Sequence, residues 1–150
     1  MRGHHGTRQA GVSLIEVVVA LFVLSIGMLG MAGLQMASLR ANQSSYERSA
    51  AVLGAYTMID RLRADVAAAQ AGSYNIEFAD DACDAPEGSS FADTQLAAWF
   101  GDLRTSVGPS ACGAVSCTGG IAGSCVVSVR WDDSRARGAS DQVFQIEARL

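Results

Sequence analysis

The strongest constraint on this chain is an apolar segment with no charged residue between Glu16 and Arg40. As an α-helix with a rise of about 1.5 Å per residue, this segment spans roughly 35 Å, enough to cross a bilayer core of about 30 Å. The sequence therefore predicts one membrane-spanning helix near the N-terminus. The rest of the 150 residues is enough for one small domain.

The residues before the apolar segment read as a short leader. Residues 1–11 are polar and basic, and the apolar run starts at Val12. A secretory signal peptide would have a shorter apolar stretch that ends in a small-residue cleavage site, and no convincing Ala-x-Ala site closes this one. The basic flank predicts that the N-terminus stays in the cytoplasm and that the C-terminal domain lies outside.

One carboxylate, Glu16, stands just inside the apolar segment. A carboxylate that faces lipid near the bilayer centre costs about 2.5 kcal/mol or more, and less near an interface. Glu16 is therefore expected to have a partner. The alternative is an interfacial glutamate in an ordinary signal anchor, with no partner.

The segment from Gly11 to Glu16 (Gly-Val-Ser-Leu-Ile-Glu), followed by Val-Val-Val-Ala-Leu-Phe-Val-Leu, resembles the class III leader site of type IV prepilins. The resemblance implies that a prepilin peptidase cuts between Gly11 and Val12 and then N-methylates Val12. It also implies that Glu16 is the assembly carboxylate, neutralised in the filament by the N-terminal amine of a neighbour. The family more often has Phe at the first mature position, so Val12 departs from the pattern.

Residues 17–35, which end in Gly-Met-Leu-Gly-Met-Ala-Gly-Leu-Gln, look like the helix of PilV-type minor pilins, the type IV pilus modification proteins. This resemblance implies a non-enzymatic subunit that sits first in the inner membrane and then in the pilus filament. Its partners would be prepilin peptidase, other minor pilins and the major pilin, with roles in pilus assembly, cell adhesion and twitching motility. A minor pseudopilin of a type II secretion system shares the same leader and helix. A signal-anchored periplasmic enzyme or binding protein is the alternative of a different class.

The expected organisation is a leader (1–11), a transmembrane and assembly helix (12–39) and a periplasmic pilin domain (40–150). One helix is expected from about Val12 to Ala69, becoming amphipathic over 40–70. Its apolar positions follow the 3–4 spacing of a buried helix face: Val52, Ala55, Tyr56, Ile59, Leu62 and Val66. This face should pack on a small antiparallel sheet, which gives an α+β, type IV pilin-like fold.

The remainder, residues 72–150, reads as loop-rich. A short helix is expected over 93–103, with Ser90 or Asp93 as its cap. The Gly-rich segment 108–124 is expected to be a loop tied down by cysteines. Alternating apolar residues predict two antiparallel strands, over 127–131 and 144–150.

Four cysteines, Cys83, Cys112, Cys117 and Cys125, all lie beyond the apolar segment. An even number in a small exported domain favours disulfides. Zinc is the alternative, but the only histidines, His4 and His5, are in the leader. The spacing does not choose among the three possible pairings.

The composition excludes several classes of function. Beyond residue 11 there is no His and no Lys, which excludes Ser–His and Cys–His pairs, a Lys Schiff base and His-rich metal sites. No cofactor is expected. Residues 72–150 carry eleven acidic residues and five arginines, which argues against nucleic-acid binding. The acidic residues Asp80, Asp81, Asp84 and Glu87 read as a solvated loop rather than a calcium site, and Trp99 and Trp131 as core residues.

Overall fold

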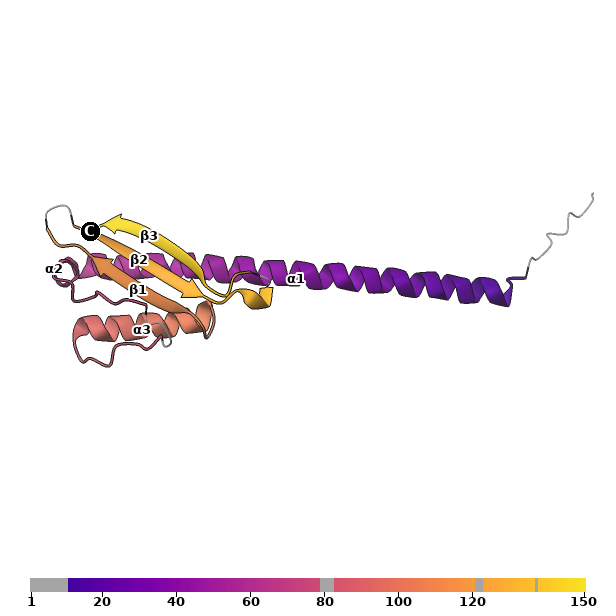
Figure 1. The fold of residues 1–150 in the computed structure, drawn as a ribbon, viewed down its shortest axis with the longest axis horizontal. Coiled ribbons are helices and arrows are strands. Elements are labelled where there is room, and N and C mark those ends of the chain that lie inside the picture. The colour runs from indigo at the N-terminus through magenta and orange to yellow at the C-terminus, as the bar shows by residue number, and fades with distance from the viewer. Residues whose placement is uncertain (1–10, 79–82, 121–122, 137) are drawn as a thin grey trace, which may run out of the picture. The chain divides into compact units, whose positions relative to one another are not determined.

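The computed structural model describes residues 11–78, 83–120, 123–136 and 138–150. Two compact units can be distinguished, one up to Leu39 and one from Arg40 to Leu150. Helix α1 (Leu14–Ala64) runs from the first unit into the second. The two units are described separately below (Figure 1).

The first unit is the apolar part of α1. Every residue from Gly11 to Leu39 is exposed, including large side chains such as Phe22 and Leu29. By length and composition α1 can cross a membrane, and none of its most apolar stretch is buried inside the protein. The predicted apolar helix is therefore confirmed. Its side chains find no protein surface to pack against within the unit.

In the second unit, one face of α1 is buried. Its core residues are Ala50, Ala51, Ala55, Met58, Ile59 and Leu62. The predicted positions Ala55, Ile59 and Leu62 are confirmed. Tyr56 was wrongly placed on this face, because it is 50% exposed, and Met58 takes its place in the core. The buried stripe starts at Ala51 and continues in steps of four, three and four residues. Tyr56 lies about 100° around the helix from Ala55, away from this stripe.

The helix ends earlier than the sequence predicted, at Ala64 instead of Ala69. Asp65 leaves helical geometry with φ −136° and ψ 59°, and a short helix α2 (Val66–Gln70) follows. The buried Tyr74 hydroxyl donates a hydrogen bond of 3.2 Å to Asp65 Oδ2. Burial, and secondarily the Asp65 carboxylate, raises the pKa of Tyr74. This contact stabilises the break at Asp65.

Three antiparallel strands form the sheet, in the order β1 (Cys112–Cys117), β2 (Ser124–Trp131) and β3 (Gln142–Arg149). A short 3-10 turn, η1 (Ser134–Ala136), lies between β2 and β3. Val115 pairs with Val127, which pairs with Ile146, so apolar side chains from all three strands share one face. The α+β fold, with a long helix packed on an antiparallel sheet, is confirmed.

Strand β1 corrects the prediction that residues 108–124 form only a loop. The glycines there suggested turns, but Gly113 serves close packing. A Cβ on Gly113 would lie 2.2 Å from Cζ3 of the buried Trp99. The strand forms because Val115 pairs with β2, a contact that local propensity does not reveal.

Helix α3 (Phe91–Ser106) confirms the predicted short helix and extends it at both ends. Ser90 is its cap, and Ser90 and Asp93 form a reciprocal capping box. The buried Trp99 on this helix donates from Nε1 to the Gly54 carbonyl of α1 over 2.9 Å. Trp131 is also buried, so both tryptophans are core residues as predicted.

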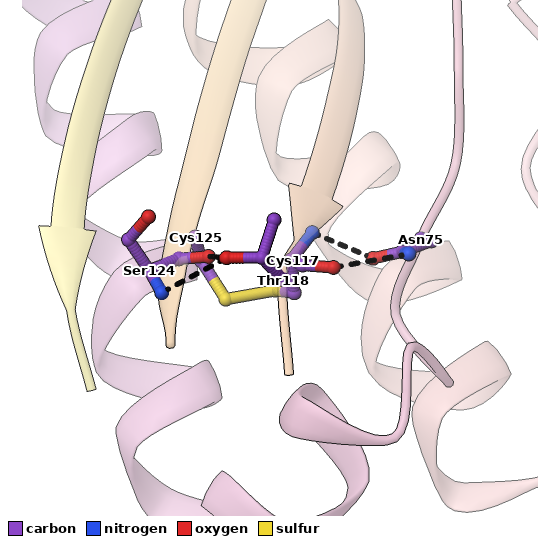
Figure 2. Close-up of a disulfide and its surroundings, with 5 residues drawn as sticks. All are labelled: Asn75, Cys117, Thr118, Ser124 and Cys125. Atoms are coloured by element: carbon purple, nitrogen blue, oxygen red, sulfur yellow. Dashed lines mark hydrogen bonds between the residues drawn. A yellow bond between two sulfur atoms is a disulfide. The ribbon is translucent and has the colours of Figure 1, made fainter. Parts of the chain in front are cut away.

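The four cysteines form two disulfides, Cys83–Cys112 and Cys117–Cys125. Figure 2 shows the second, which joins residues directly opposite each other on β1 and β2. Asn75 lies on the other side of β1, where its amide accepts from Cys117 N at 2.8 Å and donates to Cys117 O at 3.4 Å. With the bridge between Ile76 and Val115, this contact covers the outer edge of β1.

The Gly113–Trp99 contact predicts a sharp difference between two glycine substitutions. Gly113→Ala should destabilise the protein by about 1–3 kcal/mol, because the new methyl group overlaps the Trp99 ring. Gly101→Ala is the matched control, since nothing lies within 4 Å of its Cβ position on α3. It should be neutral or stabilise by up to about 1 kcal/mol. Denaturant unfolding of the full chain in detergent micelles measures both, and equal effects would contradict the packing.

The disulfide pairing predicts which double substitutions leave reactive thiols. Replacing Cys83 and Cys112, or Cys117 and Cys125, by Ala should leave no free thiol, whereas replacing Cys112 and Cys117 should leave two. The first pair closes the longer loop, with a separation of 29 against 8. Its loss should cost about 3.5 kcal/mol, against about 2.5 kcal/mol for the second pair. Thiol labelling of the unfolded protein tests the pairing, and free thiols in either matched variant would refute it.

Candidate processing and assembly site

The residues that precede α1 present an exposed, non-helical stretch. Gly11, Val12 and Ser13 lie before the helix, and nothing lies within 4 Å of the Cβ position of Gly11. The Ser13 carbonyl accepts hydrogen bonds from Glu16 N at 3.0 Å and Val17 N at 3.3 Å, which starts the helix. The Gly11–Val12 peptide bond is therefore accessible to an enzyme that needs an extended substrate.

Glu16 lies in the first turn of α1, and its side chain is exposed. A carboxylate at a helix N-terminus interacts favourably with the unpaired N–H groups there, by about 0.3–1 kcal/mol in water. Among the described residues, Glu16 has no side-chain hydrogen bond or ion pair. Its local position is therefore favourable, but its charge has no counterion in this part of the chain.

Glu16 and Val12 border the same hollow on one side of the first unit. The hollow has a volume of about 370 Å³ and is lined by Val12, Glu16, Val17, Ala20, Leu21 and Leu24. Ala20 stands one helical turn after Glu16, and its small side chain leaves room beside the carboxylate. An approaching group can therefore reach Glu16 from this side.

A comparison with known protein families matches residues 6–32 to the prokaryotic N-terminal methylation motif. The N-terminal part of the chain therefore carries the motif found at the start of type IV pilins and pseudopilins. Its motif implies processing by a prepilin peptidase and, together with the apolar helix, indicates anchoring in the inner membrane before assembly. It also indicates a structural, non-enzymatic role. No curated protein and no solved structure matches the chain.

The other predicted site residues lie in the second unit or outside the described residues. The four cysteines pair with one another. Asp80 and Asp81 of the acidic loop, and His4 and His5 of the leader, lie outside the described residues. In the part of the chain that the structure describes, no three His, Cys, Asp or Glu side chains are grouped so as to hold a metal ion.

Two polar contacts escaped the sequence interpretation. The Arg61 guanidinium donates to Asp102 Oδ2 at 2.8 Å and to the Gln95 carbonyl at 2.7 Å, both on α3. Asp133 is buried and accepts a hydrogen bond from Ser44. Neither contact has a signal in the sequence, because each joins residues more than thirty positions apart.

Proposed function

We propose that this chain is a PilV-type minor pilin, a structural subunit that is incorporated into the type IV pilus or primes its assembly. The observation that carries the proposal is the order of features at the N-terminus. The methylation motif, the exposed Gly11–Val12 bond, a lone carboxylate at Glu16 and an exposed apolar helix follow one another. The resemblance of residues 17–35 to PilV-type helices supports the subtype.

In this proposal, prepilin peptidase hydrolyses the Gly11–Val12 bond on the cytoplasmic face. The cut releases the leader and leaves a positively charged amine on Val12, which the enzyme then methylates. The new chain therefore carries a cation at its first residue and an anion four residues later, at Glu16. Both lie at the start of a segment that is otherwise free of charge.

When subunits pack, the amine on Val12 of one subunit neutralises Glu16 of its neighbour. A buried charge is tolerated when it is paired, and removing one partner of a buried pair costs about 3–5 kcal/mol. A single pair in a long apolar bundle also sets the axial register, because any other alignment leaves both charges unpaired. Apolar packing of α1 then supplies contact area, and the ion pair selects the alignment.

A minor pseudopilin of a type II secretion system would use the same leader and helix. The two roles differ in the subunits that accompany the chain, since a pilus contains a major pilin and its minor pilins. The resemblance over residues 17–35 favours the pilus. A signal-anchored enzyme or binding protein would keep its leader and would act without partner subunits.

The proposal predicts the N-terminus of the working protein. Mass spectrometry of protein extracted from membranes that contain prepilin peptidase should find a chain that starts at N-methylated Val12. The matched control is the same protein made without the peptidase, which should keep residues 1–11. An intact leader in the presence of the cognate peptidase would contradict the proposal.

Glu16→Gln should leave cleavage and methylation intact but weaken association with partner subunits. Removing one partner of a buried ion pair costs about 3–5 kcal/mol, which corresponds to a more than hundred-fold weaker affinity. The measurement is co-purification of the major and minor pilins with the tagged chain from its native membranes. Glu47→Gln is the control, because it makes the same change further along α1, outside the apolar segment, where Glu47 accepts a hydrogen bond from Gln43. Equal recovery with both variants would remove Glu16 from this role.

A further inference from the structure

A groove of about 350 Å³ lies in the second unit between α1 and α3. The residues that α1 contributes form two overlapping sets with the spacing i, i+3, i+4 and i+7: Tyr46, Ser49, Ala50 and Leu53, then Ala50, Leu53, Gly54 and Thr57. In a coiled coil, four residues with this spacing form the hole that receives one side chain of the facing helix. This side of α1 therefore has the surface that packs against another helix.

Helix α3 lines the other side of the groove with the same spacing. Its lining residues are Trp99, Asp102, Leu103 and Ser106. Small residues on both helices, among them Ala50, Gly54 and Ser106, allow a third helix to approach closely. The groove is therefore shaped to receive a helix rather than a strand or a compact ligand.

The polar side chains of the groove already have partners. Ser49, Thr57 and Ser106 each donate a hydrogen bond of 2.7–2.9 Å to the carbonyl four residues earlier on the same helix. The Asp102 carboxylate pairs with the Arg61 guanidinium at 2.8 Å. These groups leave no charge or hydrogen bond for a polar ligand to complete, which favours an apolar occupant.

The same stretch of α1 also supplies apolar side chains that project into solvent. Tyr46 is 63% exposed and Leu53 is 67% exposed, although both line the groove. They are seven residues apart and therefore lie on one side of the helix. A surface that carries both holes and projecting apolar side chains is complementary to a second copy of itself, as a two-fold symmetric interface requires.

The apolar segment determines how two copies can meet in a membrane. The stretch between Glu16 and Arg40 carries no charge, so a bilayer holds it at the same depth in every copy. Helix α1 continues from this stretch without a break as far as Ala64. In two anchored copies the α1 helices are therefore parallel and in register, and Leu53 of one copy faces Leu53 of the other.

We infer that two membrane-anchored copies of this chain form a parallel, in-register dimer, in which α1 of each copy occupies the groove of the other. Tyr46 and Leu53 pack against their counterparts at the centre, and α3 of each copy contacts α1 of its partner. Two α1 and two α3 helices then form a four-helix bundle outside the bilayer. The dimer requires the membrane anchor but not the proposed pilus role.

Disulfide crosslinking tests the register. Both native cysteine pairs are bonded, so Leu53→Cys adds one free thiol to the chain. Mild oxidation of the full chain in detergent micelles should join two copies of Leu53→Cys, because position 53 lies at the two-fold axis. Tyr56→Cys is the matched control. Tyr56 is 50% exposed but lies outside the groove, about 60° around the helix from Leu53, so this variant should give no covalent dimer.

Leu53→Glu tests whether the groove holds the dimer together. Two carboxylates would face each other in an apolar interface, which should raise the dissociation constant of the dimer about ten-fold or more. Val143→Glu is the control, because Val143 is 51% exposed on β3 and does not line the groove. Analytical ultracentrifugation in micelles measures both, and the fluorescence of the buried Trp99 and Trp131 shows that each variant is folded.

Three results would overturn the inference. The first is no covalent dimer from Leu53→Cys, or equal yields from Leu53→Cys and Tyr56→Cys. The second is a Leu53→Glu chain that stays dimeric, which would mean that the apolar segments alone hold the copies together. The third comes from native membranes, where a photoreactive residue in place of Leu53 should capture a second copy. Capture of a different protein alone would mean that a partner subunit fills the groove. None of these results bears on cleavage after Gly11, so the dimer and the proposed function fail independently.

Discussion

An apolar helix that buries none of its side chains in its own chain must be covered by lipid or by other helices. The first unit is in this position, because its large side chains from Leu14 to Leu39 are all exposed. Lipid and neighbouring helices are equally apolar, so hydrophobicity alone does not determine which of them covers the helix. In the proposed function Glu16 distinguishes them, since lipid offers no counterion to this carboxylate and the amine of another subunit would.

The second unit differs, because it buries apolar side chains in a core of its own. Residues of α1, α3 and one face of the sheet meet around Trp99, Met58 and Val127, which are all fully buried. This core is small, as expected for a domain of this length. The two disulfides compensate by restraining the segments with the fewest apolar residues, those around Cys83 and between Cys117 and Cys125. A disulfide-linked domain with its own core and an exposed apolar helix segment thus occur in one chain.

The success of the sequence interpretation depended on the range of the interactions. The apolar helix, the Ser90 cap of α3 and strands β2 and β3 follow from periodicity and capping, which are local and were predictable. Strand β1 was not predictable, because its glycines are typical of a loop. Only the structure shows that Gly113 leaves room for the Trp99 ring. The end of α1 was also missed, since the apolar pattern continues past Asp65 and the hydrogen bond from Tyr74 to Asp65 has no signal in that pattern.

The candidate sites divide in the same way. The proposed processing site lies in a contiguous motif, so Gly11, Val12 and Glu16 could be proposed from the sequence alone. The hydrogen bond between Ser44 and Asp133 joins residues 89 positions apart, and nothing in the local sequence Asp132-Asp133 indicates that the second carboxylate is buried. A contiguous motif can be found from the sequence, whereas a contact between residues far apart in the chain can be found only from the folded structure.

Most polar groups that the second unit buries or caps are satisfied within the unit. Asn75 pairs with both main-chain groups of Cys117, Trp99 with Gly54, and Arg61 with Asp102 and Gln95. Against this background, Asp133 is an exception, because its Oδ1 is buried and accepts no hydrogen bond from any described residue. The second unit therefore completes most of its polar contacts by itself, whereas the apolar side chains of the first unit remain exposed.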